Sequence, residues 1–322
     1  MKAIRITAFG GPEVLTVSDV ERPTPKAGEA LVRIAAAGVN YMDIGMRAGR
    51  RPGMTVPLTL GGEASGTVES VGEGVTDVKP GDRVMYAMVM GSYAEFAVVP
   101  VASLVLVPPD MDLVQAAALP LQGFTAHYLV HDFRKIGPGS TVLVHAVAGG
   151  VGLLLTQYAT HLGAHVIGTT STEEKAAKAK AMGAKDVIIY TKTNFADEVK
   201  RITGGKGVDL ILDAVGKTTF PGDLEAAGVR GNIVVYGASS GQADPVSPNS
   251  FSAKALTVSG AGLAAFIPTR ADIVRRADDL LAGLKAGWLK LSIEHVFPLE
   301  KAPEAHTLLE SRATSGKLLL TL

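Results

Sequence analysis

The fold can be inferred from one segment, Thr141-Val-Leu-Val-His-Ala-Val-Ala-Gly-Gly-Val-Gly152. Its first half is a solid apolar run, typical of a buried parallel strand, and its second half is a glycine turn that leads into an apolar helical pattern. Gly149 in such a turn lets the backbone approach an anion, while Gly152 lets the helix lie close to the strand. The free amides at the start of that helix, and its positive dipole end, then face the anion.

Further apolar runs follow this stretch at regular intervals. Their first residues are 21 to 25 positions apart, and helical patterns at 151–162, 173–182 and 195–202 separate the earlier ones. A βαβ series with this spacing predicts an α/β fold, a doubly wound parallel sheet of the Rossmann type. The predicted strands are residues 141–145, 165–169, 186–189, 208–213, 232–237 and 257–260.

The glycine turn departs from the strict GxGxxG spacing, because Ala146, Gly149 and Gly152 stand in the order AxxGxxG. A pattern of this kind alone is weak, and tight packing is its plain alternative. Its position at the opening of the βαβ series favours a dinucleotide site.

The residues after the second predicted strand bear on the choice of dinucleotide. An acidic residue there would bind a ribose 2′-hydroxyl, but this strand runs into Thr170, Ser171 and Thr172, with Lys175 one turn further on. Small hydroxyls and a lysine favour the 2′-phosphate of NADPH. The alternative is that Glu173, Glu174 and Lys175 form only the solvated first turn of the next helix, where Glu173 competes for a ribose hydroxyl.

Composition excludes several other classes. The 322 residues suggest about two domains, and 31 basic against 31 acidic residues give a formal net charge of +0 with no basic block, so we expect no nucleic-acid partner. The absence of cysteine excludes disulfides, iron–sulfur clusters and a thiolate zinc site. The seven histidines show no evident ligand spacing, and we expect no bound metal. The first residues contain no apolar leader and no long apolar span follows, so we expect a cytoplasmic protein without a membrane segment.

Several motifs in order, over nearly the whole chain, resemble the zinc-free quinone oxidoreductases related to ζ-crystallin, within the medium-chain dehydrogenase/reductase superfamily. They are Gly10-Gly-Pro-Glu-Val-Leu15, Ala37-Gly-Val-Asn-Tyr-Met-Asp43, Gly61-Gly-Glu-Ala-Ser-Gly66, Lys79-Pro-Gly-Asp-Arg-Val84, Ala146-Val-Ala-Gly-Gly-Val-Gly152 and Ser311-Arg-Ala-Thr-Ser-Gly316. The resemblance implies a GroES-like β-rich catalytic domain, residues 1–121 and 264–322, and a Rossmann NADPH-binding domain, residues 122–263. It also implies a cofactor cleft between the two.

In the zinc-dependent members a Cys, a His, and a Cys or Asp hold the catalytic metal. Aligned by the flanking residues, this chain has Asn40, Gly62 and Gln122 instead, and it also lacks the four-cysteine structural zinc loop. Zinc therefore cannot serve as the Lewis acid, which disfavours alcohol dehydrogenation through a metal alkoxide.

The resemblance also implies which residues surround NADPH, from the nicotinamide end through the diphosphate to the 2′-phosphate. They are Asn40, Thr125, Ala148, Gly149, Gly150, Val151, Ser171, Lys175, Tyr190, Gly237, Ala238, Ser239, Arg312 and Lys317, the last reaching toward the cofactor phosphates. One position departs from the family, because members often carry a Tyr where Gly45 follows Asp43 and Ile44 here. Tyr41 is the nearest substitute.

We therefore predict NADPH-dependent hydride transfer to a quinone or related conjugated carbonyl, with Asn40 and Tyr41 polarising the carbonyl or fixing the ring. An alkenal or enone double-bond reductase is the first alternative, and a non-catalytic, crystallin-like NADPH-binding protein is the second. Gly237-Ala-Ser-Ser-Gly241 spells the GxSxG of a hydrolase elbow, but the two prolines that follow oppose the helix this elbow requires. By analogy with the superfamily, residues 257–261 form a sheet edge that joins two subunits in a homodimer.

Overall fold

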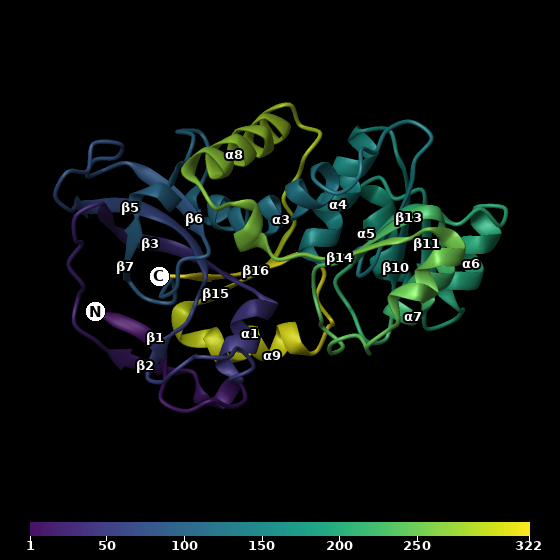
Figure 1. Cartoon of the computed structure of the whole chain (residues 1–322). Coiled ribbons are helices and arrows are strands. Elements are labelled where there is room, and N and C mark those ends of the chain that lie inside the picture. Colours follow the sequence, from purple (N-terminus) through teal and green to yellow (C-terminus); the bar gives the residue numbers. More distant parts are fainter. The chain divides into compact units, whose positions relative to one another are not determined.

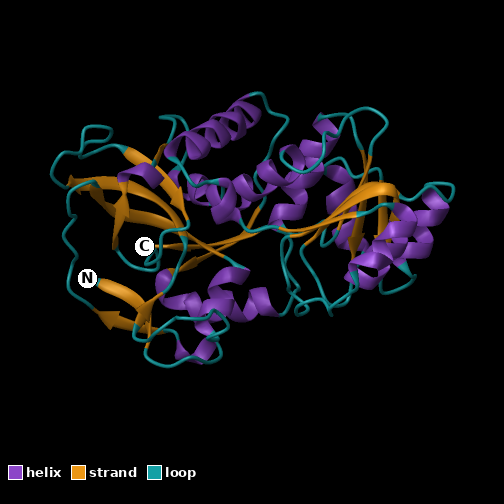
Figure 2. Cartoon of the chain, viewed as in Figure 1, coloured by secondary structure: helices purple, strands orange, loops and turns teal.

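The computed structural model describes all residues from Met1 to Leu322, and they form two compact units. The β-rich unit comprises Met1–Phe124, Ile267–Asp278 and Leu291–Leu322, and the Rossmann unit comprises Thr125–Phe266 and Asp279–Lys290. Figure 1 labels their elements along the chain, and Figure 2 separates helices from strands. Residues 279–290, which the predicted boundaries assigned to the β-rich domain, group with the Rossmann unit. The predicted domain limits themselves stay a prediction.

The Rossmann unit contains a six-stranded, entirely parallel sheet with the order β11-β10-β9-β12-β13-β14. The direction of strand succession reverses between β9 and β12, which is the topological switch point at which doubly wound sheets bind their ligands. The predicted fold class is confirmed, and each predicted run is a strand. Their bounds are β9 Thr141–Val144, β10 His165–Thr170, β11 Asp186–Ile189, β12 Val208–Asp213, β13 Ala227–Val235 and β14 Thr257–Gly260.

The central strands of this sheet are covered on both faces, which explains their continuous apolar composition. Leu143, Ile167, Ile211 and Ile233 have no exposed surface and form one core cluster. Helices α4 Gly150–His161, α5 Glu173–Ala181, α6 Phe195–Ile202 and α7 Phe220–Ala226 connect the strands and pack on the sheet. The C-terminal parts of α3 Pro120–His131 and α8 Arg270–Lys285 also belong to this unit. Short 3₁₀ helices lie at Pro248–Lys254 and Leu263–Phe266. None of the helices combines the length and apolar character needed to cross a membrane.

The β-rich unit is built on a sheet with the order β15-β16-β3-β5-β6-β8, and β7 pairs with β3 beside this path. The last strand, β16, pairs antiparallel with β3, with Leu319 opposite Gly38, so the C-terminal segment completes this sheet as the resemblance implied. The strands are β3 Glu29–Val39, β5 Glu63–Val71, β6 Arg83–Ala87, β7 Phe96–Pro100, β8 Val105–Leu106, β15 Ile293–Pro298 and β16 Lys317–Thr321.

A second, three-stranded sheet has the order β2-β1-β4. Its strands are β1 Lys2–Ile6, β2 Thr16–Asp19 and β4 Leu58–Thr59. The helices of the β-rich unit are α1 Tyr41–Arg47, α2 Leu113–Ala117 and α9 Ala302–Glu310, with 3₁₀ turns at Pro12–Val14, Val101–Ser103 and Leu299–Lys301. Helix α1 begins directly after β3, so it carries the residues of the Asn-Tyr-Met-Asp motif.

Candidate active site

The turn between β9 and α4 has the geometry predicted from its glycines. A Cβ at Gly152 would lie 2.4 Å from the carbonyl oxygen of Ala146 and 2.8 Å from that of Val147, so only glycine fits there without a shift of backbone. Ala146 itself has φ +49° and stands at a position where glycine is the usual residue. Its carbonyl oxygen accepts a hydrogen bond from the Gly149 amide at 2.8 Å, which closes the turn. The close approach expected of Gly152 is confirmed.

The N-terminus of α4 has no side-chain cap. Its cap residue is Gly149, no side chain accepts from the first-turn amides, and no acidic residue stands in that turn. By contrast, Thr172 caps α5 and Asn194 caps α6, the latter accepting from the Ala196 amide at 2.8 Å. An uncapped helix start at the switch point of the sheet leaves amide donors and a positive dipole end for an anion, so these residues fit a nucleotide diphosphate.

The strand order brings the other predicted cofactor residues of the Rossmann unit to the same edge of the sheet. All six strands are parallel, so the segments that follow their C-terminal ends share one edge. The residues in these segments are Ala148, Gly149, Gly150 and Val151 after β9, Ser171 and Lys175 after β10, Tyr190 after β11, and Gly237, Ala238 and Ser239 after β13. Thr125 lies elsewhere in the unit, buried on α3.

Glu173, the acidic residue that competes for a ribose hydroxyl, contacts a lysine side chain. Glu173, in the first turn of α5, forms an ion pair with Lys192 at 2.6 Å. Lys175 lies in the same turn, and its backbone amide donates to Thr172 Oγ1. The side chain of Tyr190 at the neighbouring strand end is more than half exposed. The strand ends of this sheet edge therefore present hydroxyl groups and Lys175. The carboxylate of Glu173 beside them is paired with Lys192.

Asn40 lies in a buried polar cluster of the β-rich unit. It precedes α1, and its Oδ1 accepts from the Lys317 ammonium at 2.8 Å. Its Nδ2 donates to Glu63 Oε1 at 3.0 Å and to the Gly38 carbonyl oxygen at 3.3 Å. Lys317 also forms a short ion pair with Glu63, and neither side chain is more than 1% exposed. The structure therefore pairs Lys317 with Asn40 and Glu63. Its place beside the cofactor phosphates stays a prediction.

Glu63 is the residue of this cluster that sequence reasoning missed. Its Oε2 accepts from the Leu121 amide at 2.8 Å, so its carboxylate joins β5, the start of α3, Asn40 and β16. A Cβ at Gly38 would overlap this carboxylate, which explains the glycine at that point of β3. The only signal in the sequence was an acidic residue inside the glycine-rich Gly61-Gly-Glu-Ala-Ser-Gly66 motif.

Asp43 fixes the backbone of Asn40 through a hydrogen bond. Its Oδ2 accepts from the Asn40 amide at 2.9 Å and from the Tyr93 hydroxyl at 3.3 Å, while its Oδ1 has no hydrogen-bond partner. Burial raises the pKa of Asp43 to about 7, opposed by the Asn40 amide and the Lys317 ammonium. The carboxyl group of Asp43 is therefore poised to titrate near neutral pH.

Tyr41 begins α1 and is held at one end only. Its hydroxyl donates to the carbonyl oxygen of Leu309 on α9 at 3.0 Å, and burial raises its pKa. The side chain still leaves 46% of the residue exposed. The ring is thus available for contact, while the hydroxyl is already used. Arg312, just beyond α9, adopts φ +57°.

The predicted hydrolase alternative does not have the geometry that it needs. The nucleophile elbow requires a helix directly behind its serine. After β13 the chain instead continues without a helix through Gly241 to the 3₁₀ turn that begins at Pro248. Ser240, the residue after the elbow serine Ser239, braces this loop: its Oγ donates to the Val215 carbonyl oxygen at 2.8 Å and accepts from the Thr218 amide.

Comparison with known proteins assigns the chain to a family. Residues 150–280 match the zinc-binding dehydrogenase family and residues 26–109 match the alcohol dehydrogenase GroES-like domain. The chain is 39% identical to quinone oxidoreductase from Pseudomonas aeruginosa, over 99% of both chains, and 34% identical to the human quinone oxidoreductase, over 100% of this chain and 98% of the other. The protein belongs to the quinone oxidoreductase family. It is equally similar to 2-haloacrylate reductase from a Burkholderia species, with 39% identity over 97% of this chain and 96% of that one.

Solved structures of this family have the same fold. Mycobacterial Rv1454c complexed with NADPH matches with a TM-score of 0.97 and 41% identity, over the full length of both chains. Escherichia coli quinone oxidoreductase complexed with NADPH matches with a TM-score of 0.97 and 36% identity, again over both full lengths. Both comparisons agree with the family that the sequence motifs resemble.

Proposed function

We propose that the protein is an NADPH-dependent, zinc-independent oxidoreductase that reduces a quinone or a related conjugated carbonyl. The observation that carries the proposal is the uncapped start of α4 at the switch point of the Rossmann sheet. Its amides are donors for a diphosphate, and the relatives above include two structures in complex with NADPH. Bound NADPH would supply the hydride.

The Rossmann unit would hold the cofactor along one sheet edge. The amides of residues 148–151 bind the diphosphate, and Gly237, Ala238 and Ser239 border the neighbouring stretch. Ser171, Lys175 and Tyr190 surround the 2′-phosphate, and Glu173 beside them forms an exposed ion pair with Lys192. We assign Thr125 to the nicotinamide–ribose end and Arg312 to the 2′-phosphate, as the family resemblance implies.

The chemistry of the residues around Asn40 supports zinc independence. The three positions that hold zinc elsewhere in the superfamily carry Asn40, Gly62 and Gln122, none of which is a thiolate, imidazole or carboxylate. The Lys317 ammonium is already bonded to Asn40 Oδ1 and to Glu63. The side-chain oxygens of Asn40 and Glu63 at this point therefore already accept from an ammonium group.

The contacts of Asn40 and Tyr41 favour a positioning role for both. Because both amide N–H groups of Asn40 already donate, to Gly38 and Glu63, Asn40 fixes the acceptor ring and its surroundings more readily than it polarises a carbonyl. Tyr41 offers an exposed ring with its hydroxyl tied to Leu309. Rate enhancement then comes mainly from orientation, which is sufficient for hydride transfer to an electron-poor ring.

Reduction of an activated double bond is the second candidate function. The observation that favours it is the 39% identity to 2-haloacrylate reductase, which is as high as the identity to the bacterial quinone oxidoreductase. Hydride delivered from the same cofactor to a β-carbon would serve this reaction. A crystallin-like protein that binds NADPH without turnover is the remaining alternative.

An acceptor panel tests these proposals. NADPH and NADH are each mixed with 1,4-benzoquinone, 9,10-phenanthrenequinone, a 2-alkenal and 2-chloroacrylate, and the loss of reduced-nicotinamide absorbance is followed. We expect turnover with the quinones and a preference for NADPH. Turnover of only the alkenal or haloacrylate would establish the second candidate, and NADPH binding without any turnover would refute both.

We also propose a homodimer joined through β14. This strand is at the edge of the Rossmann sheet, and its outer backbone groups have no neighbouring strand within the chain. Light scattering on the purified protein should give twice the chain mass of 33.3 kDa. A mass equal to one chain at micromolar concentration would contradict it.

A further inference from the structure

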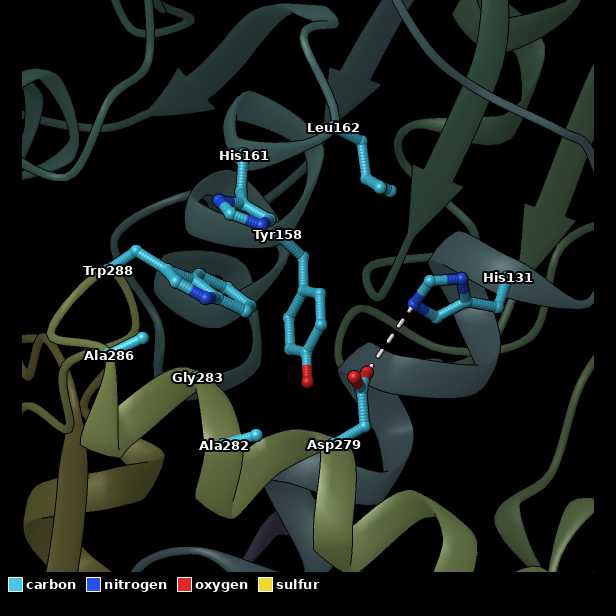
Figure 3. Close-up of a pocket in the computed structure, with 9 residues that line it drawn as sticks. All are labelled: His131, Tyr158, His161, Leu162, Asp279, Ala282, Gly283, Ala286 and Trp288. Atoms are coloured by element: carbon cyan, nitrogen blue, oxygen red, sulfur yellow. Dashed lines mark ion pairs between the residues drawn. The ribbon is translucent and has the colours of Figure 1, made fainter.

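A second cluster of ligand-type side chains lies inside the Rossmann unit. His127 and His131 are on α3, and Asp279 is on the part of α8 that belongs to this unit. His131 and Asp279 border a pocket of about 300 Å³ that Tyr158 of α4 and Trp288 also line. Figure 3 shows His131 and Asp279 facing each other, with the Tyr158 hydroxyl directed toward the same carboxylate.

The distances suit a bound metal ion. Asp279 Oδ2 lies 3.0 Å from His127 Nε2 and 3.8 Å from His131 Nε2, and one ligand atom from each residue falls within 4.8 Å of the others. Tetrahedral zinc bonds of about 2.0–2.1 Å place neighbouring ligand atoms roughly 3.3 Å apart. The two observed distances bracket this value. Histidines at i and i+4 share one helix face, so no backbone change is needed to direct both at one ion.

Tyr158 lies beside the same carboxylate. It is 2% exposed, and its hydroxyl makes no hydrogen bond of ordinary geometry. Burial raises its pKa, and the Asp279 carboxylate, toward which the hydroxyl is directed, raises it further. Its ring packs edge-on against both histidine rings, at centroid distances of 6.0 and 5.9 Å. The hydroxyl is therefore a buried donor within reach of a species bound at Asp279.

We propose that His127, His131 and Asp279 bind a divalent transition metal ion such as Zn²⁺. Two imidazoles and a carboxylate are ligands that zinc prefers, and the pocket leaves room for a water in the fourth position, within reach of Tyr158. The site uses none of the residues Asn40, Gly62 and Gln122, so it does not depend on the proposed reaction. The ion would join α3 to α8 and stabilise the folded Rossmann unit through mass action.

The chain contains its own reporter for this site. Trp288 is the only tryptophan of the sequence, and its ring lies 4.9 Å from that of Tyr158, centroid to centroid. Untagged, metal-free protein is titrated with Co²⁺, which quenches tryptophan fluorescence, and Zn²⁺ is then added as a non-quenching competitor. We expect saturable quenching with one equivalent, reversal by Zn²⁺, and a rise in Tm with Zn²⁺.

Three variants assign the ligands. His131→Asn and Asp279→Asn should each weaken Co²⁺ binding about tenfold or more, and should abolish the Zn²⁺-dependent rise in Tm. His161→Gln is the matched control, because His161 stacks on Trp288 at 4.0 Å but lies outside the ligand set. The Kd of this variant for Co²⁺ should stay within about twofold of the wild-type value. Circular dichroism of each variant verifies folding.

Two results would overturn the proposal. One is wild-type protein without saturable quenching and without a Zn²⁺-dependent shift in Tm up to about 1 mM metal. The other is metal binding that survives both ligand substitutions unchanged while the variants remain folded. In either case the three side chains form only a local histidine–carboxylate hydrogen-bond cluster.

Discussion

Replacing Lys317 by methionine tests the buried cluster that holds Asn40. Methionine keeps most of the lysine volume, so the change removes the charge with little loss of packing. Glu63, which has no exposed surface, is then left as a carboxylate without its ammonium partner. Removing one partner of a buried ion pair costs about 3–5 kcal/mol. We expect a loss near the lower end, about 3 kcal/mol, because the Leu121 amide and Asn40 Nδ2 still donate to Glu63.

A double-mutant cycle isolates the pair. Glu63→Gln alone leaves the Lys317 ammonium buried without a counter-charge, whereas Glu63→Gln with Lys317→Met leaves neither charge. The double variant should therefore lose less free energy of unfolding than the two single losses together, by about 1–3 kcal/mol. Urea denaturation followed by circular dichroism measures all four proteins. Additive losses, or a loss below about 1 kcal/mol for Lys317→Met as in exposed pairs, would refute the reasoning.

The same variant separates two roles for Lys317. If Lys317 acts by holding Asn40, the Kd for NADPH should change less than about twofold while the KM for the quinone rises. If Lys317 binds the cofactor phosphates, as the family resemblance implied, the Kd for NADPH should rise about tenfold or more. Calorimetry on the folded variant distinguishes the two.

Three further predictions concern the titration of Asp43, the glycine turn and the 2′-phosphate. The folded pKa of Asp43, about 7, lies above its ordinary value. The free energy of unfolding of the wild type, relative to that of Asp43→Asn, should therefore fall by up to about 4 kcal/mol as pH rises from 4 to 7. A difference in urea denaturation that does not change with pH would contradict this. Gly152→Ala should raise the Kd for NADPH about tenfold or more in calorimetry, because its Cβ would lie 2.4 Å from the Ala146 carbonyl oxygen, whereas Gly262→Ala, with open space around its Cβ, should not; equal affinities would argue against the turn. Lys175→Ala should weaken NADPH about tenfold more than NADH, and Lys180→Ala in the last turn of α5 should affect neither; equal losses for both cofactors would remove Lys175 from the 2′-phosphate site.

The parallel sheet was predictable because each of its strands can be identified from a short, continuous segment of sequence. Each strand is a continuous apolar run, and the regular spacing of these runs indicates their connections. Helix α7 was missed because Pro221 and Gly222 stand in its first turn and read as chain breakers, although proline is well tolerated there. Strand β13 begins at Ala227, earlier than its predicted start at 232, because the residues between include Gly228 and Gly231 and lack an apolar run.

The polar clusters were beyond a local reading because their partners are distant in sequence. Glu63 and Lys317 are 254 residues apart, and the pairings of β16 with β3 and of β3 with β5 bring them together. The histidines on α3 were read as showing no ligand spacing, although 127 and 131 are one helical turn apart, and Asp279 comes from a helix about 150 residues later. A local pattern identified the anion-binding turn, whereas tertiary contacts alone reveal that Glu63 and Lys317 hold the side chain of Asn40.

A single-turnover experiment with metal-free protein tests directly whether NADPH bound to this protein reduces a quinone without zinc. The protein is stripped of metal with a chelator, loaded with one equivalent of NADPH, and mixed with excess 9,10-phenanthrenequinone in a stopped-flow instrument. The account predicts full loss of the reduced-nicotinamide absorbance in one exponential phase, at a rate that added Zn²⁺ does not increase. Absence of quinone-dependent oxidation, or oxidation only after zinc is restored, would contradict it.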